Sequence, residues 1–98
     1  MTPEAIALIA AYFTCSEAAE LRVLERTEAE ACAAAYMEIK VGFVPNVDMQ
    51  AYQSMTPEER ADVNRRGYAA YVAWRAANPD LVSQMEAEAR QRLLQADG

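Results

Sequence analysis

A chain of 98 residues is long enough for one small domain, which we expect to span residues 1–98. Its formal net charge of −6 argues against broad affinity for nucleic acid, because the chain would repel the phosphates. The chain has no histidine, the commonest general base and metal ligand, and its three glycines form no phosphate-binding loop. We therefore expect no enzyme, no metal and no other cofactor.

The first part of the chain favours a helix throughout. Alanine accounts for 21 residues of the chain, and the stretch Thr2 to Val41 contains no glycine and no proline after Pro3. Such residues lose little rotamer freedom in a helix, so the sequence predicts an all-α fold. We expect a small bundle of four to five helices with a long N-terminal helical stretch.

That N-terminal stretch would be roughly 58 Å long as one helix, which is more than a domain of this size usually spans. We therefore predict a break near residues 14–16, giving helices over 3–14 and 16–41. The run Thr14-Cys15-Ser16-Glu17 supports the break, because a threonine three residues before a glutamate matches a capping box. One continuous helix that bends at 14–16 is the alternative.

Glutamates interrupt the apolar side of this stretch. If it is helical, Glu17 and Glu28 project from much the same face as its apolar residues. With three more glutamates they would form an acidic face that meets a basic surface on a partner; a merely solvated charged face is the alternative. The set is Glu17, Glu20, Glu25, Glu28 and Glu38.

The two cysteines, Cys15 and Cys32, would lie about 25 Å apart along one helix, whereas a disulfide needs Cα atoms within ~7 Å. A bond between them would require a sharp reversal of the chain, so we expect free thiols in a reducing compartment. No uncharged run reaches the ~18 residues of a membrane helix, and Glu4 stands where a signal peptide carries a basic residue. A cytoplasmic protein that does not bind membranes is expected.

Lys40 and Gly42 predict the end of the long stretch, because glycine readily adopts the left-handed conformation that terminates helices. A short helix is then predicted over 47–54. Its cap would be Asn46 or Asp48.

Thr56-Pro57-Glu58-Glu59 is the strongest helix start in the chain, with a capping residue, a proline at the first helical position and a capping-box glutamate. This helix should reach about residue 77. Gly67 lies in its interior with no turn residues beside it, which predicts that another helix approaches closely. A last helix is predicted over 79–95.

Four residues follow one another at three- and four-residue steps along the outer side of the 57–77 helix: Arg65, Tyr68, Val72 and Arg75. Arginine next to aromatic and apolar side chains is typical of protein interfaces. The alternative is a second buried side of the same helix. Binding of a single nucleic-acid strand is disfavoured by the net charge.

A short, acidic, alanine-rich helical chain with five such glutamates and no catalytic residues resembles the anti-CRISPR proteins of bacteriophages. The resemblance implies a protein partner, a subunit of a CRISPR–Cas effector in the host bacterium. The acidic residues would then block a basic nucleic-acid or nuclease-docking surface.

Two other classes of function are alternatives. One is a self-associating structural or assembly protein of phage or bacterial origin, in which the first helix pairs with its mate in a homodimer. The other is a transcriptional regulator that uses the basic cluster Arg60, Arg65, Arg66 and Arg75.

Overall fold

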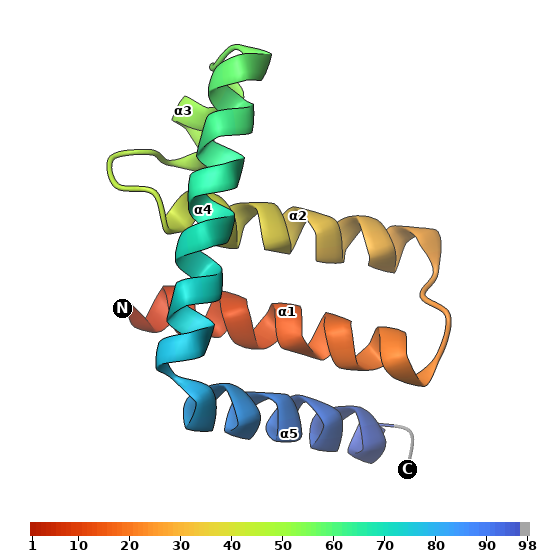
Figure 1. Cartoon of the computed structure of the whole chain (residues 1–98). Helices are drawn as coiled ribbons and strands as arrows, with labels where there is room; N and C mark the ends of the chain where they lie inside the picture. The colour runs from red at the N-terminus through yellow and green to blue at the C-terminus, as the bar shows by residue number, and fades with distance from the viewer. Residues whose placement is uncertain (97–98) are drawn as a thin grey trace.

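Helices make up almost all of the structure, a computed structural model that describes residues 1–96 (Figure 1). The last two residues of the expected 1–98 domain lie outside the described residues. The five described helices are α1 Pro3–Leu21, α2 Arg26–Gly42, α3 Met49–Gln53, α4 Pro57–Ala77 and α5 Pro79–Ala96. Residues 1–96 contain no strand, which confirms the predicted all-α bundle.

Three of these helices form a layer in which α1 lies between α2 and α5 (Figure 1). The helix α4 crosses one end of this layer, where it packs on α2, and α3 lies beside the start of α4. The principal extents are 45 × 32 × 19 Å, so the molecule is flat. One layer crossed by a single helix leaves large parts of α1, α2 and α5 facing outward.

The predicted break at residues 14–16 is wrong, and so is the bent continuous helix. The helix α1 continues through these residues to Leu21, and the chain turns at residues 22–25 instead. Thr14 Oγ1 and Ser16 Oγ each donate a hydrogen bond of 3.2 Å to the carbonyl oxygen one turn earlier, Ala10 O and Tyr12 O. The hydroxyls therefore bond within the helix and do not cap a new one.

The turn at 22–25 is closed by charged side chains. Arg22 donates two hydrogen bonds to Glu28, of 2.9 and 2.7 Å. Glu28 Oε1 also accepts a hydrogen bond of 3.0 Å from the backbone N–H of Glu25. These hydrogen bonds satisfy one of the amides at the start of α2 and favour the charged carboxylate. Together they lower the pKa of Glu28 from 4.5 to about 2, with the Arg22 side chain as the largest cause.

The expected free thiols are also a wrong prediction. Because the chain reverses at 22–25, Cys15 on α1 faces Cys32 on α2, with Cα atoms 5.8 Å apart, and the two form a disulfide. Disulfides persist mainly in oxidising compartments, so these cysteines give no support to a cytoplasmic location.

The larger core lies where α4 crosses the three-helix layer. Its buried members come from four helices: Ile9, Phe13, Ile39, Tyr71, Val82, Met85 and Ala89. A second, smaller core joins the end of α2, the connection around α3 and the start of α4, centred on Val41, Val44 and Val63. The position of α4 therefore depends on both cores.

The close approach predicted at Gly67 is confirmed. A Cβ atom at this position would overlap the carbonyl oxygen of Lys40 and lie 2.6 Å from the carbonyl carbon of that residue, so α2 and α4 touch backbone to backbone. The Thr56 capping box and the end of α4 at Ala77 are also as predicted. Gly42 ends α2 as expected but without a positive φ; the left-handed residue is Asn46, with φ 65°.

Candidate functional site

The crossing of α2 and α4 leaves a groove on the outer side of the molecule, with a cavity volume of about 480 Å³. Its lining residues come from α2 and α4 and are Tyr36, Lys40, Ala61, Asn64, Arg65 and Tyr68. We call this the α2–α4 groove. The groove is shallow and largely open to solvent.

Two of the residues predicted to make an interface, Arg65 and Tyr68, line the groove, and Val72 follows one helical turn after Tyr68. Tyr68 is 54% exposed and Val72 is 44% exposed, so the described chain does not cover them. Of the two alternatives for this side of α4, the buried one is therefore wrong at Tyr68 and Val72.

Arg75, the fourth residue of the predicted strip, turns inward. Its Nη1 donates a hydrogen bond of 3.3 Å to the hydroxyl of Tyr71, and its guanidinium carbon lies 5.3 Å from the centre of the Phe13 ring. The nearest carboxylate, Glu86 on α5, is 3.7 Å away. The Tyr71 hydrogen bond is the main cause that raises the pKa of Arg75. Arg75 therefore closes the edge of the core and does not belong to the groove.

Sequence reasoning missed the α2 side of the groove, Tyr36 and Lys40. Tyr36 stacks on Tyr12 of α1 at 4.9 Å between ring centres and meets Tyr71 edge-on at 5.8 Å, so α1 and α4 hold its ring in place. Burial raises the pKa of its hydroxyl. The only signal in the sequence is the four-residue spacing of Tyr36 and Lys40, which puts them on one helix face.

Lys40 is the only lysine of the chain. Its Nζ lies 4.4 Å from the centre of the Tyr36 ring, a cation–π contact, and burial lowers its pKa. Within residues 1–96, no carboxylate lies at ion-pair distance from it. Arg65, the other cation of the groove, bonds Asp62 at 3.1 Å with a side chain 71% exposed. The groove thus presents a cation without a carboxylate next to two tyrosine rings.

The five predicted acidic residues do not lie on one continuous helix, because the chain turns between Glu20 and Glu25. Glu17 and Glu20 both bond Arg90 of α5, at 2.7 and 2.8 Å, and only 12% of the Glu17 side chain is exposed. Glu28 closes the turn with Arg22, as described above. Three of the five glutamates are therefore engaged within the chain, and Glu25 and Glu38 remain exposed.

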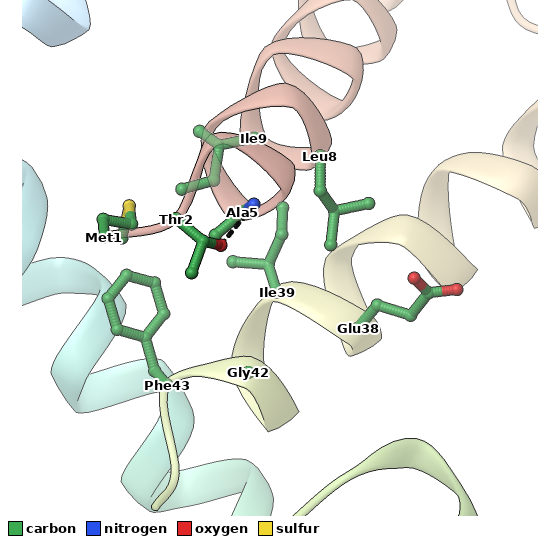
Figure 2. Close-up of a pocket in the computed structure, with 9 residues that line it drawn as sticks. All are labelled: Met1, Thr2, Ala5, Leu8, Ile9, Glu38, Ile39, Gly42 and Phe43. Atoms are coloured by element: carbon green, nitrogen blue, oxygen red, sulfur yellow. Dashed lines mark hydrogen bonds between the residues drawn. The ribbon is translucent and has the colours of Figure 1, made fainter.

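Glu38 lies at a second, smaller pocket of about 240 Å³ between the start of α1 and the end of α2. Figure 2 shows its walls, which are mostly apolar and include Leu8, Ile39 and Phe43. The hydroxyl of Thr2 already accepts a hydrogen bond of 3.1 Å from the backbone N–H of Ala5. The walls of this pocket can therefore hold an apolar side chain.

A third surface lies at the opposite end of the layer. Leu24 and Leu93 line one shallow pocket beside the disulfide, and their chain neighbours Val23 and Leu94 are 92% and 58% exposed. We call these four residues the end patch. Scattered apolar exposure is normal, but a valine as open as Val23 is not explained by packing within the chain.

Within the described part of the chain, no three histidine, cysteine, aspartate or glutamate side chains converge as metal ligands would. None of the helices in that part has an apolar window long enough to cross a membrane.

Comparison of the chain with protein-family models, curated protein sequences and solved structures gave no significant match.

Proposed function

We propose that this chain is a small protein-binding module that acts without catalysing a reaction and docks through the α2–α4 groove. One observation carries the proposal. The side chain of Tyr68, 54% exposed, stands next to a rigidly held tyrosine and a lysine that no carboxylate of residues 1–96 pairs. Tyrosine is among the side chains that most often carry the binding energy of protein interfaces.

The specific form of this proposal is an inhibitor of a CRISPR–Cas effector in the cytoplasm of a host bacterium, as the resemblance implies. Support from the acidic set is limited to Glu25 and Glu38, because Glu17, Glu20 and Glu28 are bonded to arginines of the same chain. In such an inhibitor, the exposed aromatic face of α4 contributes binding energy beyond that of charge.

Photocrosslinking tests the docking surface. A photoreactive phenylalanine analogue replaces Tyr68 in one variant and Val23, which is far more exposed, in the control. We expect a covalent adduct in bacterial cells from position 68 only, and mass spectrometry identifies the protein. Adducts of the same protein from both positions, or none from position 68, would reject docking through the groove.

The inhibitor identity needs a functional assay: plating of a phage targeted by a CRISPR–Cas system on cells that express this chain. We expect the wild-type chain to restore plating and Val72→Asp to abolish the effect. The control Leu81→Asp, at an exposed position of α5 outside the groove and the end patch, should retain it. An acidic contribution is tested with Glu25→Gln and Glu38→Gln, which leave the internal ion pairs intact. If the wild-type chain never restores plating, the inhibitor identity is rejected.

Self-association is the second candidate function, and the end patch favours it. A homodimer would cover Val23 and Leu94, which are exposed in the single chain. Sedimentation velocity over a range of concentrations tests this. A monomer at every concentration, unchanged by Val23→Asp, would reject it.

A further inference from the structure

The α2–α4 groove combines three features that together specify a ligand chemistry. Its base is a tyrosine ring fixed by stacking, its α4 wall carries a half-exposed tyrosine, and its α2 wall carries Lys40. The two rings favour an apolar or aromatic side chain. The lysine favours a carboxylate.

Charge within the chain is distributed unevenly around this groove. Arg22, Arg26, Arg75 and Arg90 each lie within 4.0 Å of a carboxylate elsewhere in residues 1–96. Within residues 1–96, Lys40, Arg60 and Arg92 have none, and of these three cations only Lys40 lines the groove. A partly buried ammonium without a counterion is unfavourable, so an incoming carboxylate gains a charge-assisted hydrogen bond there.

We propose that the α2–α4 groove binds an acidic segment of another protein, with a carboxylate at Lys40 and an adjacent apolar side chain between Tyr36 and Tyr68. This inference rests on the proposed docking function and adds the chemistry of the partner. Asn64, which makes no hydrogen bond from its side chain in the described structure, lies in the same groove and can donate to the segment.

The number of cations in the groove decides against nucleic acid as the occupant. A nucleic acid needs several phosphate contacts, whereas the groove offers two cations, of which Arg65 is already paired with Asp62.

The test is a selection of short random peptides displayed on phage against the immobilised protein, with a blank surface as reference. The affinity of the most enriched peptide is then measured by fluorescence polarisation. Four variants are compared with the wild type: Tyr68→Ala, Lys40→Gln, Lys40→Arg and Arg26→Gln. The last is the matched control, since it neutralises a cation of α2 outside the groove. Circular dichroism verifies that each variant is folded.

We expect enriched peptides to carry Asp or Glu next to an apolar residue. Lys40→Gln should weaken binding about tenfold, and Tyr68→Ala by about tenfold or more. Lys40→Arg should restore most of the affinity, Arg26→Gln should leave it unchanged, and added salt should weaken it.

Other outcomes separate this inference from the docking proposal. If Tyr68→Ala weakens binding but Lys40→Gln does not, the groove is a docking site and the acidic partner is wrong. If neither variant changes peptide binding, both the docking site and the acidic partner are wrong. If no peptide is enriched over the blank surface, the proposal of an acidic partner segment is wrong. Binding of a fluorescent single-stranded oligonucleotide that Lys40→Gln abolishes overturns it in favour of nucleic acid.

Discussion

Because α2 and α4 cross so closely, we expect Gly67→Ala to destabilise the protein, although helix propensity alone would make this substitution stabilising. Replacing a helical glycine with alanine ordinarily stabilises a protein by about 1 kcal/mol. At Gly67 the new Cβ would overlap the carbonyl oxygen of Lys40 and lie 2.6 and 2.9 Å from its carbonyl carbon and Cα. Carbon atoms pack at ~3.5–4.0 Å, so the two helices would have to separate by about 1 Å.

A backbone cannot move aside as a flexible side chain does, so we place the overpacking cost at the upper end of its usual range, about 3 kcal/mol. After the propensity gain, Gly67→Ala should lower the free energy of unfolding by about 2 kcal/mol. For a chain of this size, that loss lowers Tm by roughly 10 °C. Thermal unfolding followed by circular dichroism measures it.

Gly42 is the matched control, because it also lies in a helix and a Cβ there would meet nothing within 4 Å. Gly42→Ala should be neutral or stabilising by up to about 1 kcal/mol. A Gly67→Ala protein as stable as the wild type would refute the backbone contact between α2 and α4, and with it the geometry of the groove.

Two further predictions concern the α1–α2 turn. Because Cys15 and Cys32 are 17 residues apart, the chain-entropy relation gives their disulfide about 3 kcal/mol of stability, so the double serine variant should lose that amount in urea unfolding. Equal stability of the two proteins would contradict it. The folded-state pKa of Glu28, about 2, lies below 4.5, so its pairing contributes stability above pH 4.5 that is lost as the pH falls through about 2. In Arg22→Gln, NMR titration of the Glu28 carboxyl carbon should give a pKa closer to 4.5, and a value still near 2 would show that Arg22 is not the main cause.

Local chemistry determined most of the helices. The Thr56 capping box begins α4 and the proline at 79 begins α5, both as predicted. Of the two caps considered for the short helix, Asp48 and not Asn46 caps α3, through Ala51, and α3 spans Met49–Gln53 and not 47–54. These signals act between residues within one turn of each other, so no knowledge of the rest of the chain is needed. Gly67 was informative for a related reason: a glycine that costs stability within its own helix indicates a neighbour.

The turn between α1 and α2 was decided by tertiary structure. Hydroxyls at Thr14 and Ser16 can cap a helix or bond back within it, and both choices look alike in sequence. Packing of α1 between α2 and α5, with the Cys15–Cys32 bond and the Glu17–Arg90 pair, holds the longer helix. The separation of Cys15 and Cys32 predicted along one helix was therefore wrong, because the two lie on different helices.

The candidate site divides in the same way. Periodicity alone placed Arg65, Tyr68 and Val72 on one outer face of α4, since helical spacing is local. Periodicity did not reveal that α2 brings Tyr36 and Lys40 beside them, or that Arg75 turns toward Phe13. Those positions depend on the crossing of two helices about thirty residues apart in the chain, which is determined by how their side chains pack.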